Sequence, residues 1–513
     1  MKILLLNPSV HFDKQFGTLK KFYTPIPSVG LAYIGGMLLK HDFEVVGLDA
    51  FIECLTVEEM YERIAAEAPD VVGISLLTPC APLVDRLIPL LRERFPGLKV
   101  VMGNIHASAF HEHYLLNEMA DFIVHHEGES TMLELMEALR DGRDTSKIPG
   151  ISYRSLFGQV IRNADRPWID KFSLDEMPYP AWDLFPVEQF RPDIRLQSPD
   201  SRKRKFDEGV QALPILATRG CPHRCTFCSP INTIGNKYRM RTPENVVDEM
   251  EYFHQKWGVE TFYYMDLTFP ISEGIGIQFC DALIKRNLPI KWMCETRVSS
   301  VTYPLLQKMK QAGCVRIDYG IECGNQKMLD SIKKGFKIEQ VRKAIDWTRK
   351  AEIETEGLFI IGLPGETVED TWDTINFALS LDLDHIKLNL FVPYPGSELW
   401  DVLKARNELT NLDFNEYTSY PSFTGGTVPY VPKGRAHEEL VRLQKIGMRK
   451  AMFRKRVIFR ELRHFRWDKV DQYFTAVKAL LFPPPVDTTS DRFEVLSAPS
   501  STGGAPSGGG GSR

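Results

Sequence analysis

Two long stretches of the sequence alternate short apolar runs with amphipathic helical patterns, and this alternation restricts the fold more than any other feature. Strands separated by helices pair in parallel, because a parallel neighbour needs a long crossover connection. We therefore predict an α/β fold in which residues 1–142 form a doubly wound parallel sheet. The expected strands are Lys2–Leu6, Glu44–Leu48, Val71–Leu76, Lys99–Met102 and Phe122–Val124, and the expected helices are Val29–Leu39, Val57–Glu67, Ala81–Arg94 and Ser130–Arg140.

The second alternating stretch spans residues 211–405 and repeats the strand–helix pattern six times. Six such units predict a partial (β/α)6 barrel, whose functional site lies at the carboxyl ends of its strands. The expected strands are Leu213–Thr218, Thr261–Met265, Ile290–Cys294, Val315–Tyr319, Thr355–Ile361 and His385–Phe391. Two of the expected helices are Pro243–Trp257 and Val368–Leu381.

The remaining segments differ in composition from the two α/β regions. Residues 143–210 are rich in proline and charge, and we interpret them as a linker whose basic run at 202–205 lies in a solvated loop. Residues 406–482 predict a C-terminal helical region. Residues 483–513 consist largely of Pro, Ser, Thr and Gly and predict a disordered tail, whose GGGGSR end resembles an engineered linker.

Composition excludes several classes of protein. Lys and Arg number 63 against 67 Asp and Glu, a net charge of −4, so no bulk positive field predicts nucleic-acid binding. No apolar run reaches the length of about 18 residues that a transmembrane helix needs, and the N-terminus does not resemble a secretory signal. Nine cysteines, an odd number, favour reduced thiols over a disulfide framework, and we expect a cytoplasmic protein.

Three of the nine cysteines form a compact array directly after the first expected barrel strand. Cys221, Cys225 and Cys228 have the spacing C-x-x-x-C-x-x-C. A cubane [4Fe–4S] cluster has four irons, so three thiolates would leave one iron open to a further ligand, as a catalytic cluster requires. The alternatives are a zinc site completed by His223 and a set of unreactive thiols.

The array resembles the signature of radical S-adenosylmethionine enzymes. The resemblance implies that the open iron binds S-adenosylmethionine, that one electron cleaves it to a 5′-deoxyadenosyl radical, and that Phe227 packs near the adenine. It also implies that polar residues at successive strand ends bind the cofactor, and the candidates are Asp266, Arg297 and Glu322. The strand-end motifs are Tyr264-Met-Asp266, Glu295-Thr-Arg297, Gly320-Ile-Glu322, Gly362-Leu-Pro-Gly365-Glu366 and Pro393-Tyr-Pro-Gly396. Cys323 is a further thiol beside Glu322, interpreted as a packed core residue; the alternative is an extra ligand or a hydrogen-atom donor.

A doubly wound domain ahead of such a barrel is similar to the cobalamin-binding class of these enzymes, and the resemblance covers residues 1–405. It implies a Rossmann-like cobalamin-binding domain over residues 1–142. Small and hydroxyl-bearing residues let the backbone approach a flat macrocycle and reach its nucleotide tail. The residues that match the corrin-binding loops are Ser75, Thr78, Gly103, His106 and Gly128.

One feature of related cobalamin modules is missing. No Asp-x-His-x-x-Gly motif, which would supply a cobalt-ligating histidine, follows Asp49, so His106 is either an axial ligand or a hydrogen-bonding loop residue. A domain without cofactor or with another nucleotide is the alternative, although no Gly-x-Gly-x-x-Gly follows the first strand. Methylthiotransferases share the barrel signature but have three further clustered cysteines, for a second cluster, in their N-terminal domain. They are excluded because the N-terminal region here holds only Cys54 and Cys80.

The leading functional hypothesis is methylation of an unactivated carbon in a secondary metabolite, a lipid or a tetrapyrrole. The alternatives are an oxygen-independent oxidative cyclase, similar to anaerobic magnesium-protoporphyrin monomethyl ester cyclase, and a non-catalytic cofactor-binding or sensor module. The resemblance implies a reducing partner such as flavodoxin or ferredoxin. Basic and aromatic residues alternate over 445–478, where we expect a helix that caps the barrel; the alternative is peripheral contact with the inner face of a membrane.

Overall fold

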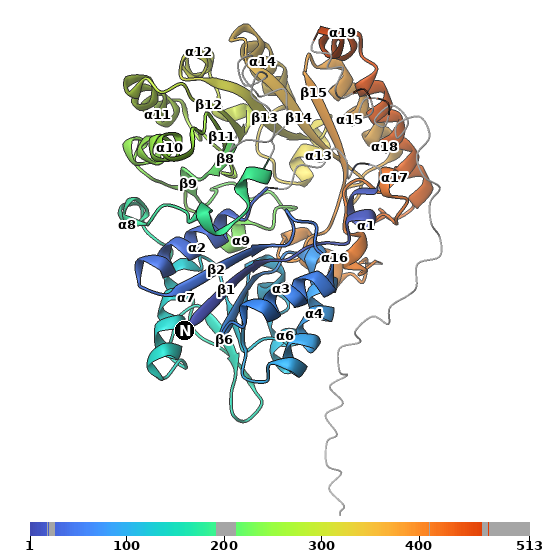
Figure 1. Ribbon diagram of the computed structural model, residues 1–513. Coiled ribbons are helices and arrows are strands. Elements are labelled where there is room, and N and C mark those ends of the chain that lie inside the picture. Colours follow the sequence, from blue (N-terminus) through green and yellow to red (C-terminus); the bar gives the residue numbers. More distant parts are fainter. Residues whose placement is uncertain are drawn as a thin grey trace, which may run out of the picture.

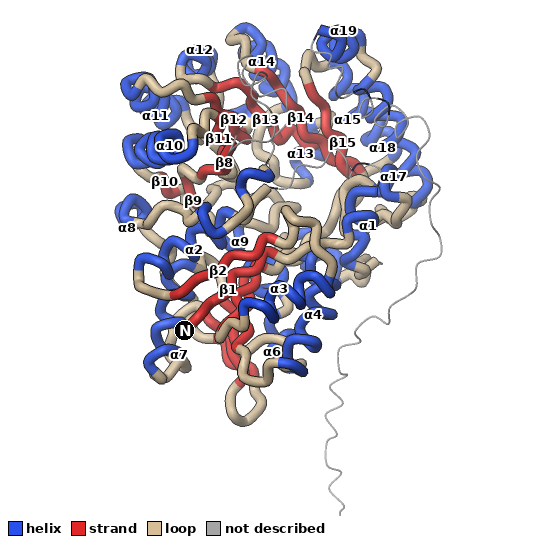
Figure 2. Tube along the Cα trace, viewed as in Figure 1, coloured by secondary structure: helices blue, strands red, loops and turns tan. Residues whose placement is uncertain are grey.

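The computed structural model describes residues 1–17, 19, 26–190, 212–409, 411–463, 470 and 474 of the chain. Two large sheets, each flanked by helices, make up its body (Figures 1 and 2). The mixed α/β class predicted from the sequence is confirmed. Within the described ranges, no helix has both the length and the apolar character needed to cross a membrane.

The N-terminal sheet has seven strands in the order β2-β1-β3-β4-β5-β6-β7, and its first five strands are parallel. The order reverses direction at β1, and such switch points are where doubly wound sheets bind ligands. The parallel strands are β1 Lys2–Asn7, β2 Glu44–Asp49, β3 Val71–Ser75, β4 Lys99–Gly103 and β5 Phe122–Val124. The helices that follow these strands along the chain are α1 Phe12–Phe16, α2 Val29–Lys40, α3 Val57–Glu67, α4 Ala81–Arg94, α5 Asn104–Ala109, α6 His111–Leu116 and α7 Glu129–Asp141.

The sheet extends beyond residue 142, into the segment predicted to be a linker. Strands β6 (Ile151–Arg154) and β7 (Val160–Arg162) add an antiparallel hairpin to β5. Helix α8 (Lys171–Glu176) then leads toward the barrel. The interpretation of 143–210 as a linker therefore has to be corrected for its first part, while the basic run at 202–205 lies outside the described residues.

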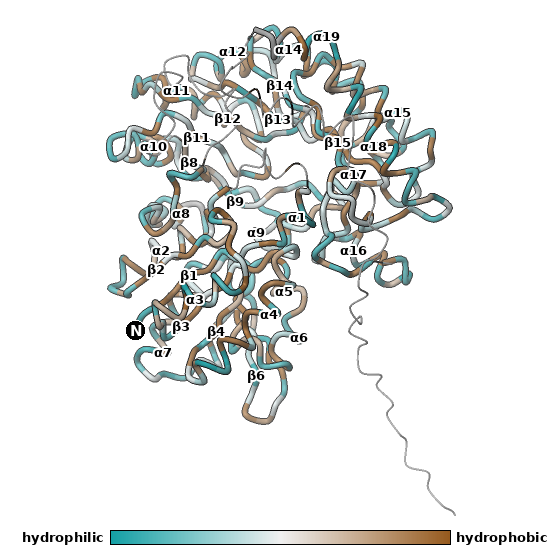
Figure 3. The backbone as a smooth tube through the Cα atoms, turned by 45° about the vertical axis from the view of Figure 1, so that its right-hand side comes forward, coloured by the Kyte–Doolittle hydropathy of each residue, from teal (hydrophilic) through white to brown (hydrophobic). Residues whose placement is uncertain are grey.

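Alternate residues of the central strand β1 pack into two different cores. Ile3 and Leu5 join the core that includes α2 and α7, whereas Leu4 and Leu6 join the core with α3 and α4. This alternation is what a strand buried on both faces requires. The surface helix α10, by contrast, carries both hydrophilic and hydrophobic stretches in Figure 3, because one of its faces is exposed.

The second sheet is an open, fully parallel arc in the order β15-β14-β13-β12-β11-β8, as expected for a partial (β/α)6 barrel. A short antiparallel pair, β9 with β10, follows its first strand. The strands are β8 Ala212–Ile215, β9 Thr218–Arg219, β10 Arg239–Met240, β11 Thr261–Tyr264, β12 Lys291–Thr296, β13 Cys314–Glu322, β14 Glu354–Ile361 and β15 His385–Leu390. The helices are α9 Ile231–Ile234, α10 Pro243–Trp257, α11 Glu273–Arg286, α12 Tyr303–Gln311, α13 Gln326–Ser331, α14 Ile338–Lys350, α15 Val368–Ser380 and α16 Glu398–Ala405.

The C-terminal region packs on the last strand of the barrel. Helix α18 (His437–Met452) covers β15, where Gln444 Nε2 donates to the Leu388 carbonyl at 2.8 Å. Helices α17 (Pro421–Thr424) and α19 (Lys455–Arg463) lie before and after it. Much of 464–482 and all of the predicted tail 483–513 lie outside the described residues. Membrane contact through 445–478 stays a prediction, as do the domain limits other than that of the linker.

Candidate functional site

A cavity of about 710 Å³ lies between the carboxyl ends of the N-terminal strands and the start of the barrel. Its N-terminal wall comes from the loops after β1, β3, β4 and β5, which are the ends where a doubly wound sheet binds ligands. Its barrel wall includes residues 216, 218–220, 230, 233–234 and 265–267, and Tyr394 and residues 417–420 close another part. The volume is within the range of small-molecule and cofactor sites.

Three of the five residues predicted to bind cobalamin line this cavity. Ser75, Gly103 and Gly128 all contribute to the wall. A Cβ atom at Gly128 would lie 3.1 Å from Ile34 Cδ1, so a side chain there would crowd the wall of the cavity. Small residues at these three positions therefore leave room for a ligand along this part of the wall.

The other two, Thr78 and His106, are buried behind the wall rather than in it. His106 Nδ1 lies 3.3 Å from Thr78 Oγ1, and its ring packs against Phe110 and Phe414, with centroids 4.6 and 4.9 Å away. Burial lowers the pKa of His106 to about 3. The structure thus does not bring His106 to the cavity, and of the two predicted roles it favours the hydrogen-bonding one.

The buried, neutral His106 makes stability depend on pH. Its folded-state pKa of about 3 lies below the ordinary value of 6.5, so below pH 6.5 the unfolded chain binds a proton that the folded chain does not. This residue's contribution to stability is therefore lost as pH falls from about 6.5 toward 3. Between pH 7.5 and 5.5, we expect the thermal midpoint of a His106→Gln variant to fall less than that of the native chain. Parallel melting curves at both pH values test this, and an equal loss in the two proteins would contradict it.

The predicted cysteine loop begins where β9 ends, at one edge of the cavity. Gly220 has a φ of +80°, and a Cβ there would lie 2.1 Å from the Lys237 carbonyl oxygen, so this turn requires glycine. The loop is anchored further along, where Thr226 N donates to the Ile332 carbonyl at 3.1 Å and Leu399 N donates to the Thr226 carbonyl at 2.9 Å. Its two ends, at Gly220 and Pro230, line the cavity.

The three thiols lie close together in this loop. Burial, followed by the neighbouring sulfurs of Cys225 and Cys221, raises the pKa of Cys228 to about 12. Arg297 Nη1 donates to Cys225 Sγ at 3.6 Å, and Cys221 Sγ lies 3.9 Å from Thr268 Oγ1. Among the described residues, no three His, Cys, Asp or Glu side chains converge as a single metal ion requires. A cubane cluster needs no such convergence, because each thiolate binds a different iron.

Two further predicted residues, Arg297 and Glu322, come together with a lysine that sequence reasoning missed. Lys334 Nζ donates to Glu322 Oε1 at 2.7 Å, and all three side chains are buried. Arg297 Nη2 donates to the Lys334 carbonyl, and Lys334 Nζ lies 5.8 Å from the centre of the Phe227 ring. Lys334 follows α13, away from any strand-end motif, and only its place in a Lys-Lys-Gly-Phe run marked it in the sequence.

Asp266, the remaining predicted residue, lies two residues after the end of β11 and lines the cavity. It is buried and accepts hydrogen bonds from Thr218 Oγ1 and, at 3.2 Å, from Ala217 N. Burial raises the pKa of Asp266 to about 6. Asp266 lines the cavity together with Met265 and Leu267, so it faces the space between the two sheets.

Buried polar atoms without partners show that the site suits polar cofactors. His223 Nε2, Thr226 Oγ1 and Arg297 Nε, all in or beside the cysteine loop, have no hydrogen-bond partner within the part of the chain that the structure describes. Glu129 Oε2, in the cavity wall, also has no hydrogen-bond partner among the described residues. A buried polar atom without a partner is costly, so such atoms at one place indicate a site for a ligand.

Comparison with known proteins agrees with this geometry. The Radical SAM superfamily matches residues 215–378, and the B12 binding domain matches residues 17–136. The chain is 31% identical to an uncharacterized methyltransferase of Pyrococcus horikoshii, over 82% of this chain and 86% of that protein. It is 30% identical to the anaerobic magnesium-protoporphyrin IX monomethyl ester cyclase of Rubrivivax gelatinosus, over 81% of this chain and 72% of the cyclase.

Among solved structures, the fold resembles the radical S-adenosylmethionine methyltransferase TsrM from Kitasatospora setae, with a TM-score of 0.62 and 21% identity over 80% of this chain and 77% of that one. The chain therefore belongs to the cobalamin-binding radical S-adenosylmethionine enzymes. Its cofactors are a [4Fe–4S] cluster, S-adenosylmethionine and cobalamin, as the sequence predicted.

Proposed function

We propose that this enzyme transfers a methyl group from S-adenosylmethionine, through cobalamin, to an unactivated carbon of a small molecule. The observation that carries the proposal is the shared cavity. Its wall holds Ser75, Gly103 and Gly128 on one side and both ends of the cysteine loop, at Gly220 and Pro230, on the other. Two cofactors bound at these walls would open onto one space, which is what passing a methyl group to a nearby substrate requires.

When bound, the cluster supplies the electron that cleaves S-adenosylmethionine, and cobalamin carries the methyl group. We assign Cys221, Cys225 and Cys228 to the cluster. The positive charges of Arg297 and Lys334 beside this loop would attract an anionic cluster and the carboxylate of S-adenosylmethionine. Phe227 offers an aromatic face to the adenine, and Glu322 holds Lys334 in place.

We place the substrate in the lumen of the barrel, next to the cavity. On β11 and β14, side chains that face the helices are buried, whereas Tyr263 and Leu358, on the opposite face of these strands, are only partly buried. Met265, directly after β11, is also partly buried. Tyr263 Oη donates to Glu295 Oε1 at 3.0 Å. Glu295 is on β12 and precedes Arg297, which directly follows this strand, by two residues, a separation of about 7 Å along an extended chain. This polar lumen favours a metabolite with hydrogen-bonding groups over a fully apolar lipid.

An oxidative cyclase is the second candidate, supported by the 30% identity to the Rubrivivax gelatinosus cyclase over most of both chains. Both candidates use the same cofactors and differ in their products. Methylation releases S-adenosylhomocysteine together with 5′-deoxyadenosine, because one S-adenosylmethionine donates its methyl group and another is cleaved. Oxidation or cyclisation without methyl transfer releases 5′-deoxyadenosine alone.

The test begins with anaerobic purification from cells supplied with cobalamin. We expect about four irons and about one cobalt per chain, measured by metal analysis and the absorption spectrum. With dithionite and methyl-labelled S-adenosylmethionine, we expect S-adenosylhomocysteine and 5′-deoxyadenosine to form together. The second product without the first would favour the cyclase. Neither product under strong reductant would favour a non-catalytic module, and four irons without cobalt would exclude methyl transfer through cobalamin.

A further inference from the structure

A buried arginine joins the cysteine loop to the loop of the N-terminal domain that carries Gly128. Arg219 lies two residues before Cys221, across the tight turn at Gly220. Cys221 N donates to the Gly235 carbonyl at 3.1 Å, so the backbone after Arg219 is held at both sides of the turn. The position of the Arg219 side chain is therefore coupled to the position of the first residues of the cysteine loop.

The guanidinium of Arg219 reaches both carboxylates that flank Gly128. Arg219 Nη2 donates to Glu129 Oε1 at 2.6 Å, and Nη1 lies 3.5 Å from Glu127 Oε1. The neighbouring strand adds Arg239, which pairs in register with Arg219 and donates through Nη1 to Glu127 Oε2 at 2.8 Å. Two arginines of the barrel thus form ion pairs with one loop of the cobalamin-binding domain.

This contact is almost fully shielded from water and touches the cavity. Arg219, Glu127 and Glu129 are 9%, 7% and 3% exposed, and all three line the cavity. Glu129 Oε2 has no hydrogen-bond partner among the described residues, so it is available to N–H donors such as the peripheral amides of a corrin. Separating a buried ion pair is costly because each charge is left without compensation, whereas separating an exposed pair costs little.

We propose that Arg219 is a positioning residue that fixes the Gly128 loop relative to the cysteine loop, so that the affinity for cobalamin depends on an arginine of the barrel. The proposal rests on the cofactor pair and holds whether the product is methylated or cyclised. Failure of the product assay described above would leave it intact, because its own test measures cofactor binding.

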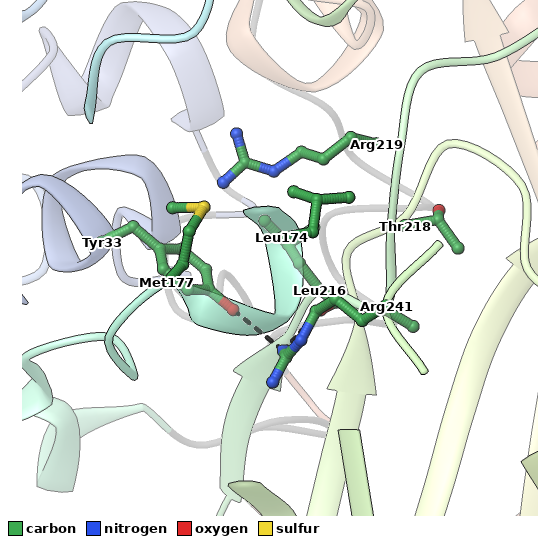
Figure 4. Close-up of a pocket in the computed structure, with 8 residues that line it drawn as sticks. Tyr33, Leu174, Met177, Leu216, Thr218, Arg219 and Arg241 are labelled. Atoms are coloured by element: carbon green, nitrogen blue, oxygen red, sulfur yellow. Dashed lines mark hydrogen bonds between the residues drawn. The ribbon is translucent and has the colours of Figure 1, made fainter. Parts of the chain in front are cut away.

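A second buried ion pair provides a matched control; it lies within the barrel and contacts the N-terminal domain through Tyr33. Arg241 Nη1 lies 2.6 Å from Glu249 Oε2 and donates to Tyr33 Oη of α2 at 3.2 Å. Figure 4 shows Arg241 directed to the Tyr33 hydroxyl, while Arg219 extends along the other side of the same pocket. This pair is as deeply buried as the first, yet neither Arg241 nor Glu249 lines the large cavity.

The experiment compares two double variants of the full chain, each of which removes both charges of one pair. They are Arg219→Met with Glu129→Gln, and Arg241→Met with Glu249→Gln. Removing both partners avoids leaving a buried charge alone. Hydroxocobalamin is titrated into each protein after cluster reconstitution. We expect the Kd of the first variant to rise by about tenfold, a common size for coupling between sites, while iron content and the control's Kd stay at native values. Equal Kd values in the two variants would overturn the proposal.

Two further measurements cover a variant that folds poorly. Arg219→Lys keeps the positive charge, but a lysine ammonium lacks the planar guanidinium that contacts both carboxylates. We therefore expect the Kd to rise, but by less than in the double variant. At saturating cobalamin, the cob(II)alamin electron paramagnetic resonance signal reports its distance from the reduced cluster through its relaxation. We expect this relaxation to change in the Arg219 variants and not in the Arg241 control. Native relaxation and native Kd in a folded Arg219→Lys protein would refute the positioning role.

Discussion

Replacing Cys225 by alanine is expected to abolish reductive cleavage of S-adenosylmethionine. The Cys225 sulfur is the one that receives a hydrogen bond from Arg297, at 3.6 Å. Without it, two thiolates remain for a cluster that needs three protein ligands and one open iron. Iron content, the absorption band of the cluster and the yield of 5′-deoxyadenosine should fall together, and the last should fall below detection.

Cys323→Ala is the matched control, because it removes a thiol close to the same site. Cys323 follows Glu322, is almost completely buried, and burial raises the pKa of its thiol well above the ordinary value, so it is a packed, protonated group. We expect this variant to keep its iron and its cleavage activity. A protein that loses its cluster on Cys323→Ala, and keeps it on Cys225→Ala, would show that the cluster ligands are misassigned.

Several helix positions were predictable from the periodicity of their apolar residues, and capping signals mark some of their ends. Helices α3, α4 and α10 begin and end at the predicted residues. Before α3, Thr56 Oγ1 accepts from Glu59 N at 3.2 Å while Thr56 N donates to Glu59 at 2.8 Å, a capping box that is legible in the sequence. Gly258, in the left-handed conformation, ends α10.

The β6–β7 hairpin was not predictable in the same way. Its strands have only four and three residues, too few for a periodic pattern to stand out from the surrounding proline-rich and charged sequence. They are strands because β5 offers an edge to pair with, which is a tertiary cause.

The residues of the candidate site also divide into those that the sequence revealed and those that it did not. Cys221, Cys225 and Cys228 were found by their spacing after an expected strand, and Arg297 and Glu322 by the resemblance of the strand-end motifs that carry them. Arg219 and Lys334 were missed, because each acts through a partner that no spacing rule connects to it. Arg219 meets Glu129 from 90 positions away, and Lys334 comes from a loop after a short helix.

Lys334→Met is expected to be among the most destabilising single substitutions in the barrel. Lys334 and Glu322 are 5% and 6% exposed and lie 2.7 Å apart, so removing the lysine leaves a buried carboxylate without its partner. Breaking a buried pair in this way costs about 3–5 kcal/mol. Denaturant unfolding of the full chain, together with the thermal midpoint, measures the loss.

The neighbouring residue provides the control for this prediction. Lys333 also forms an ion pair, with Glu398 at 2.7 Å, but both side chains are more than half exposed. Lys333→Met should therefore cost less than about 1 kcal/mol. The double variant Lys334→Met with Glu322→Gln should recover most of the stability that Lys334→Met loses, because no unpaired charge remains. If the double variant were as unstable as the single one, the loss would come from packing around Lys334 rather than from the buried charge of Glu322.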